Sequence, residues 1–104
     1  MIRTSVIVLS LVAAASLSQG ASAADAEQGG TLAKRWCAAC HVVAADQQSA
    51  GGQAPPFSAI GKMPGLDTAR LALFLLLPHP KMPDMNLTRS EAADIAAYIQ
   101  SQGK

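Results

Sequence analysis

Apolar side chains recur at helical spacing in three stretches of the chain: residues 26–40, residues 68–77, and the stretch between Thr88 and Gly103. Leu32 and Trp36 form an i, i+4 pair in the first stretch, and Ile95, four residues before Ile99, belongs to an apolar stripe in the last. No run alternates for long enough to predict a strand. The pattern predicts an all-α domain with about three main helices and long connections.

Capping residues mark the boundaries of these helices. Asp25 and Asp67 each precede a predicted helix, where an aspartate accepts hydrogen bonds from the first free backbone amides. Thr88 and Glu91 have the spacing of a capping box, in which each side chain bonds the backbone amide of the other residue. A Pro-His-Pro turn at residues 78–80 ends the second helix.

Two adjacent glycines, Gly29 and Gly30, interrupt the first predicted helix. Each weakens a helix by about 1 kcal/mol relative to alanine. A packing reason is expected to offset that cost, and close approach of another helix is such a reason.

The second predicted helix is apolar around most of its circumference, so we expect it to be largely buried or covered. Residues 42–64, by contrast, are rich in Gly, Pro, Gln and Asp and read as a loop. A loop of this length is unusual in so small a domain. We expect it to wrap around something.

The N-terminus has the three parts of a secretory signal. Arg3 supplies the positive charge, residues 5–17 an apolar core, and residues 21–23 the small-residue cleavage site. The apolar run of about a dozen residues is shorter than the roughly 20 that span a bilayer as a helix. We expect residues 1–23 to be a cleaved signal peptide and residues 24–104 to form one domain, with an uncleaved anchor as the alternative.

The mature chain is expected to be electrically neutral. The whole sequence has eight Lys and Arg and seven Asp and Glu, and the signal contains only one of these charges, on Arg3. Nothing resembles the basic stripe of a nucleic-acid-binding protein or a charge block for a membrane surface. With one Trp, one Tyr and two Phe, the domain has little aromatic mass for a core. Domains of this size often need a disulfide, a metal or another staple.

The most informative motif is Cys37-Ala38-Ala39-Cys40-His41. Two cysteines at this spacing can each form a thioether with a haem vinyl group, and the following histidine is then held against the iron. Export fits this reading, because c-type haem proteins mature outside the cytoplasm. The motif predicts one covalently bound haem c.

Three other interpretations of the two cysteines compete with haem attachment. A disulfide suits an oxidising compartment, but so short a loop gains little stability from it. A thioredoxin-like redox pair needs a βαβ context, and no strands are predicted. A zinc site formed by Cys37, Cys40, His41 and His79 would place two ligands on adjacent residues.

A haem bound by His41 leaves the sixth coordination position of the iron to be filled. Cytochromes c commonly pair histidine with methionine. Met82 is the best placed candidate, because it precedes Pro83 in a rigid loop, six residues before Thr88. The other candidates are Met63, Met85 and His79.

The sequence resembles the class I monohaem c-type cytochromes, which are small exported electron carriers. The resemblance rests on residues 29–41, 54–57, 78–87 and 90–98, and so covers nearly the whole mature chain. It implies a cytochrome c-like fold whose loops wrap around the haem.

The resemblance also implies roles for single residues. Gly29 and Tyr98 stand where family members cross their first and last helices, and Met82 stands where they have the axial methionine. A proline carbonyl after the long loop is expected to accept a hydrogen bond from the haem-ligating histidine. Pro55 matches that position best, with Pro56 adjacent and not excluded.

The expected function is one-electron transfer in the periplasm by a non-enzymatic monomer, without stable membrane insertion after cleavage of the signal. Transient redox partners are expected: a dehydrogenase or quinol-oxidising complex as donor, and an acceptor such as a terminal oxidase. A haem enzyme or gas sensor with a labile sixth ligand is the alternative, although no distal acid-base pair is evident. A non-haem exported interaction module is a third class.

Overall fold

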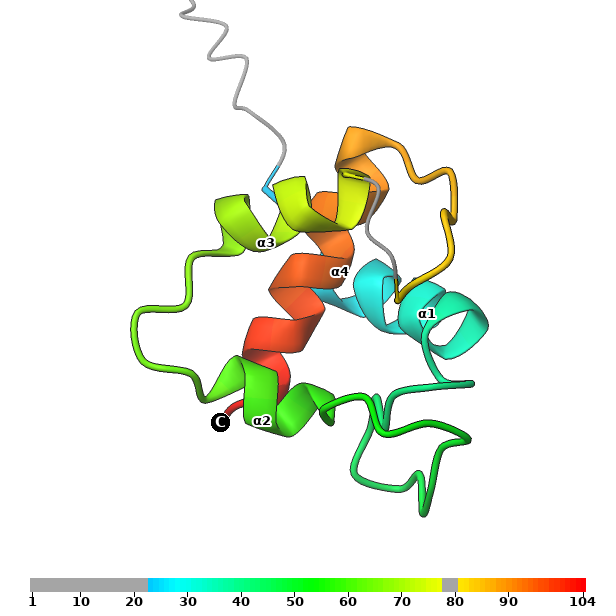
Figure 1. Cartoon of the computed structure of the whole chain (residues 1–104). Coiled ribbons are helices and arrows are strands. Elements are labelled where there is room, and N and C mark those ends of the chain that lie inside the picture. Colours follow the sequence, from blue (N-terminus) through cyan, green and yellow to red (C-terminus); the bar gives the residue numbers. More distant parts are fainter. Residues whose placement is uncertain (1–22, 78–80) are drawn as a thin grey trace, which may run out of the picture.

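The computed structural model describes residues 23–77 and 81–104. Within these ranges it contains four helices and no strand (Figure 1), which confirms the all-α prediction. The helices are α1 (Ala26–Trp36), α2 (Phe57–Gly61), α3 (Thr68–Leu76) and α4 (Arg89–Gln102). None of these helices has the length and hydrophobicity needed to span a membrane. The predicted signal, apart from its last residue, and the turn at 78–80 lie outside the described residues.

Two boundaries differ from the prediction. The first helix ends at Trp36 and not at residue 40, with the Cys37 amide bonded to the carbonyl of Ala33 as its C-cap. The predicted loop at residues 42–64 contains the short helix α2, which follows Pro56 and buries Phe57. A five-residue helix among prolines and glycines has no periodicity that the sequence could reveal.

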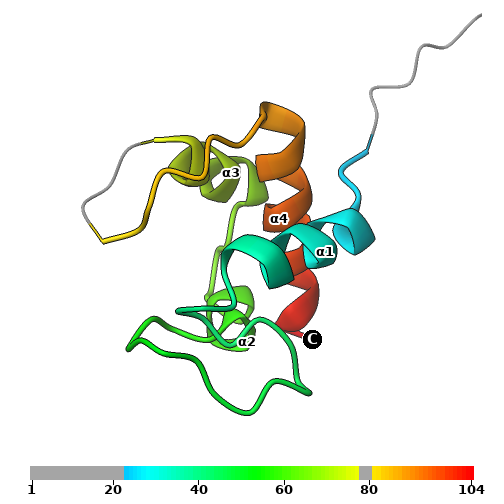
Figure 2. The ribbon, with the colours of Figure 1, turned by 90° about the vertical axis from the view of Figure 1, so that its right-hand side faces the viewer.

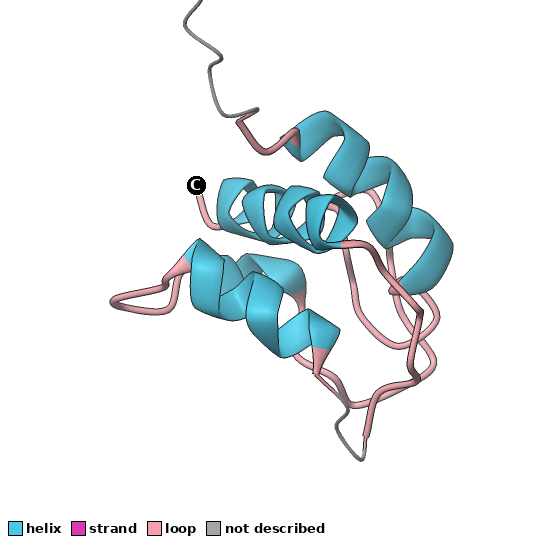
Figure 3. Cartoon of the chain, turned by 90° about the horizontal axis from the view of Figure 1, so that it is seen from above, coloured by secondary structure: helices cyan, strands magenta, loops and turns pink. Residues whose placement is uncertain are grey.

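Helix α4 lies at the centre of the fold, with α1 on one side and α2 and α3 on the other (Figure 3). A small core forms where these helices meet. Its buried members are Leu32, Ala33, Cys37, Val43, Phe57, Ile95 and Ile99. Since α1, α2 and α3 all pack on α4, the last helix organises the domain.

The close helix contact expected from the paired glycines is confirmed. A Cβ atom on Gly29 would lie 1.9 Å from the carbonyl oxygen of Asp94, and one on Gly30 would lie 2.9 Å from the ring of Tyr98. The buried Asp94 carboxylate also accepts a hydrogen bond of 2.7 Å from the backbone amide of Asp25. Helices α1 and α4 therefore cross in direct backbone contact.

A second glycine contact joins α2 to the end of α4. A Cβ atom on Gly61 would lie 2.5 Å from the carbonyl oxygen of Ile99, and one on Gly103 would lie 2.2 Å from the carbonyl carbon of Gly61. Neither residue can take a side chain without moving a helix. The sequence marks Gly103 only as the residue after a helix.

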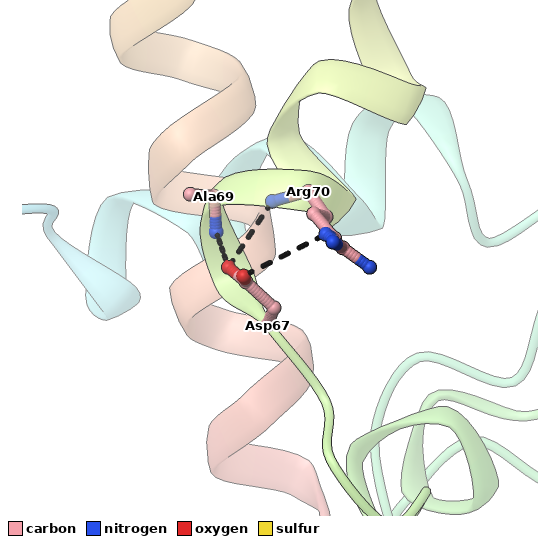
Figure 4. Close-up of polar contacts among 3 residues, drawn as sticks. All are labelled: Asp67, Ala69 and Arg70. Carbon is pink, nitrogen blue, oxygen red and sulfur yellow. Dashed lines mark hydrogen bonds and ion pairs between the residues drawn. The ribbon is translucent and has the colours of Figure 1, made fainter.

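Helix α3 begins as predicted. The Asp67 carboxylate accepts hydrogen bonds from the amides of Ala69 (2.9 Å) and Arg70 (3.3 Å), and the Arg70 side chain lies 4.0 Å from it (Figure 4). The ion pair is exposed, so it adds little stability beyond the cap.

Within the described residues the protein chain covers α3 only in part, so the expectation that this helix is buried or covered stays a prediction. Leu71 and Leu75 pack against the core, but the helix has no fully buried residue. Its exposed apolar side chains are Leu73, Phe74 and Leu76, followed by Leu77. Trp36 is also 41% exposed, with the Arg35 guanidinium 5.0 Å from its ring centroid, so Leu32 alone of the predicted pair enters the core.

Candidate haem site

The CxxCH motif forms a tight turn at the end of α1. The carbonyl oxygen of Cys37 accepts hydrogen bonds from the amides of Cys40 (3.1 Å) and His41 (2.9 Å). Cys37 is buried and Cys40 is exposed, and the two cysteines are not joined in a disulfide. The turn therefore keeps the cysteines and the histidine within a single unit.

The imidazole of His41 is buried and oriented. Its Nδ1 atom lies 2.7 Å from the carbonyl oxygen of Pro55, and its ring centroid lies 5.2 Å from that of Phe57. A carbonyl oxygen can only accept, so Nδ1 carries a proton, and in the neutral imidazole the lone pair is then on Nε2. This is the tautomer that can bind a metal through Nε2.

Pro55 and Pro56 have different carbonyl partners. The Pro55 oxygen accepts from His41, whereas the Pro56 oxygen accepts from the amides of Ala59 (3.0 Å) and Ile60 (3.2 Å) in α2. The first turn of α2 thus engages Pro56 and leaves Pro55 to orient the imidazole.

The candidates for the sixth ligand occupy different surroundings. Met82 is half-buried in the segment that leads to α4, while Met85 packs against the hydrophobic core. Met63, between α2 and α3, is 57% exposed, and His79 lies outside the described residues.

The segment that carries Met82 has a defined turn. The Asp84 carboxylate accepts a hydrogen bond of 2.9 Å from the amide of Asn86, whose φ of 52° is in the left-handed region that asparagine tolerates. This segment, orange in Figure 2, and part of the green loop that contains Pro55 extend to the same side of the helices.

Gln47 is the site residue that sequence reasoning missed. Its side-chain nitrogen lies 3.0 Å from the carbonyl oxygen of His41 and 3.1 Å from that of Ala38. Its side-chain oxygen accepts a hydrogen bond of 2.9 Å from the amide of Val43. A glutamine in an irregular loop belongs to no motif, so no local signal could have identified it.

The donor set fits a haem better than the other readings of the cysteines. Burial raises the pKa of the Cys37 thiol to about 11, which disfavours the thiolate that a redox nucleophile needs. In the described part of the chain no three His, Cys, Asp or Glu residues are grouped to hold a metal ion. Thiols at thioether spacing, an oriented imidazole and nearby apolar side chains suit covalent haem.

Comparison with known proteins gave one curated relative of high similarity. The chain is 54% identical over 91 residues to cytochrome c-552 of Bradyrhizobium diazoefficiens, an alignment that covers 88% of each chain. No protein-family model and no solved structure matched. From this identity and coverage, the chain belongs to the class I monohaem c-type cytochromes, the haem c electron carriers, and its cofactor is one covalently bound haem.

Proposed function

We propose that the protein is a periplasmic one-electron carrier whose haem is attached through Cys37 and Cys40 and ligated by His41 and Met82. The observation that carries this proposal is the hydrogen bond from His41 Nδ1 to the Pro55 carbonyl oxygen. It leaves Nε2 as the coordinating atom and makes the imidazole a better donor.

Met82 is proposed as the sixth ligand because the surroundings of the other two described methionines suit this role less well. Met85 is engaged in the core and Met63 is exposed, whereas Met82 is half-buried beside Pro83. A thioether favours the ferrous state and raises the reduction potential. With both axial positions filled by the chain, the iron has no open site for a substrate.

The chain's own residues would supply the environment of the haem. Exposed apolar side chains on α3, including Leu73 and Phe74, offer it a nonpolar surface. Exclusion of water there would limit reorganisation when the charge on the iron changes. Electrons would leave through a haem edge that is exposed near the thioethers of Cys37 and Cys40.

Partners and location complete the proposal. Residues 1–23 would be removed on export, and the carrier would act as a monomer between a dehydrogenase or quinol-oxidising complex and an acceptor such as a terminal oxidase. Redox encounters use small interfaces, below about 1,200 Å² in total, which allows rapid exchange. The near-zero charge of residues 24–104 argues against strong long-range steering.

The test is the reactivity of the purified haem protein. We expect a low-spin six-coordinate spectrum in both oxidation states, a reversible one-electron potentiometric titration, and no binding of carbon monoxide by the ferrous form. Rapid formation of a ferrous carbon monoxide adduct would contradict the carrier function and favour a haem with a labile ligand.

A further inference from the structure

The backbone around the haem-attachment turn is bonded to the loop that follows it. The carbonyl oxygen of Ala39 accepts a hydrogen bond of 2.9 Å from the amide of Gly51, and that of Val42 accepts one of 2.9 Å from the amide of Phe57. These bonds pair backbone groups that would otherwise be paired within a helix or strand, since residues 42–56 form neither. They do not satisfy the carbonyls of Ala38 and His41.

The side chain of Gln47 forms hydrogen bonds with these two carbonyl groups. The Gln47 amide nitrogen lies 3.0 Å from the oxygen of His41, 3.1 Å from that of Ala38 and 3.2 Å from that of Ser49. Its two N–H groups are therefore shared among three carbonyl oxygens. The amide oxygen of the same side chain accepts from Val43, so donor and acceptor ends are both used.

These contacts hold a different part of His41 from the one that Pro55 holds. Pro55 fixes the imidazole through Nδ1, whereas Gln47 fixes the main chain of the same residue through its carbonyl. Ala38 lies between the two cysteines, so its bond to Gln47 also restrains the segment that carries the thioethers. Loop, attachment turn and imidazole are thereby coupled through one amide.

We propose that the Gln47 side-chain amide is the positioning group that holds the Cys37–His41 turn, and with it the His41 ring, in the geometry that binds the haem iron. The proposal rests on the proposed role of His41 as an axial ligand. The side-chain hydrogen bonds of Gln47 described above all go to backbone atoms, so Gln47 would act through His41 and not on the iron.

The first measurement uses the unmutated holoprotein. Nuclear magnetic resonance follows exchange of the side-chain NH₂ protons of Gln47 and of its exposed neighbour Gln48. We expect the Gln47 protons to exchange at least about tenfold more slowly, because opening of the hydrogen bonds must precede exchange. Equal rates would overturn the proposal without the need for any variant.

The second measurement uses Gln47→Glu, with Gln48→Glu as the charge-matched control. The ionised carboxylate of the Gln47→Glu variant keeps an acceptor for Val43 but has no donor for the carbonyls of Ala38 and His41. We expect the paramagnetic shifts of the His41 ring protons in the ferric holoprotein to change in Gln47→Glu and to stay at wild-type values in the control. A Gln47→Glu variant that is less stable but has unchanged His41 shifts would show a merely structural role and overturn the proposal.

A third variant separates the two ends of the amide. Gln47→Met has similar length and no charge, so it removes both donor and acceptor. We expect the Val43 amide to exchange about tenfold faster in Gln47→Met and to stay protected in Gln47→Glu. If neither variant accumulates as holoprotein, the proposal is tested by the exchange rate of the Gln47 side-chain protons in the wild-type holoprotein. If the wild-type spectrum shows no histidine ligation, the proposed role of His41 as an axial ligand is wrong. Slow exchange of the Gln47 side-chain protons would still show that the hydrogen bonds of Gln47 form.

Discussion

His41 forms a hydrogen bond with Pro55 through its ring and one with Gln47 through its main-chain carbonyl. The two bonds differ in how well they can be predicted from the sequence. The CxxCH motif is local, so the attachment turn could be predicted from five residues. The bond to Pro55 spans 14 residues and was expected only because the chain resembles a known family. The bonds to Gln47 follow from the path of an irregular loop, which no periodicity specifies.

The sixth ligand gives the residue-scale prediction. In Met82→Ala the iron should lose its thioether, and the weak long-wavelength absorption band typical of methionine-ligated ferric haem should disappear. Met85→Ala is the matched control: it removes a methionine that packs on the core, so it should lower stability by about 2–5 kcal/mol at most while the band remains. Retention of the band in Met82→Ala would exclude Met82 as the ligand.

Among the elements, the helices with strong caps were the predictable ones. Asp25, Asp67 and Thr88 each cap a helix at the position expected from sequence. The short α2 was missed because its stability comes from burial of Phe57 and from the Gly61 contact with α4, which are tertiary effects. Helical spacing paired Trp36 with Leu32 but did not show that Trp36 is 41% exposed, because the period alone does not tell where the buried face of a helix ends.

The crossing of α1 and α4 can be tested with Gly29→Ala. Alanine should favour an isolated helix by about 1 kcal/mol, yet its Cβ would meet the backbone of Asp94 at 1.9 Å. Backbone cannot turn aside as a side chain can, so we expect a net loss of about 1–3 kcal/mol or more in the free energy of unfolding by urea. Gly52→Ala, whose Cβ would be 3.5 Å from Cys40, should change stability far less. An equal effect in both variants would contradict a tight crossing.

The capping box of α4 gives a pH-dependent prediction. Hydrogen bonds from the backbone amide and the hydroxyl of Thr88 lower the pKa of Glu91 below its ordinary value. A depressed pKa in the folded state stabilises the protein above the ordinary pKa of the group, and this contribution is lost as pH falls. The difference in stability between wild type and Glu91→Gln should therefore shrink from about pH 6 to about pH 3 in chemical denaturation. A difference that stays constant with pH would show that ionised Glu91 contributes nothing.

The whole molecule has a small core for its length. Among the described residues, the largest fully buried side chains are Ile95, Ile99 and Val43, and large apolar groups on α3 remain exposed. About a quarter of the hydrophobic residues of the sequence lie in the predicted signal, and the rest lie in residues 24–104. Covalent haem c would supply the missing aromatic mass, and parts of the loops at residues 42–56 and 81–88 extend to the same side of the helices (Figure 2). The low number of aromatic residues predicted that the domain needs a cofactor, a metal or a disulfide to stabilise it. The composition could not specify the path of the loops.

Thermal unfolding of the Cys37→Ala/Cys40→Ala chain, followed by circular dichroism beside the wild-type holoprotein, tests most directly whether this fold depends on its haem. The double variant cannot form either thioether. We expect it to be largely unfolded or degraded, with no cooperative transition, while the holoprotein melts in a single transition. A haem-free variant that melts cooperatively at the temperature of the holoprotein would contradict the view that haem completes the core.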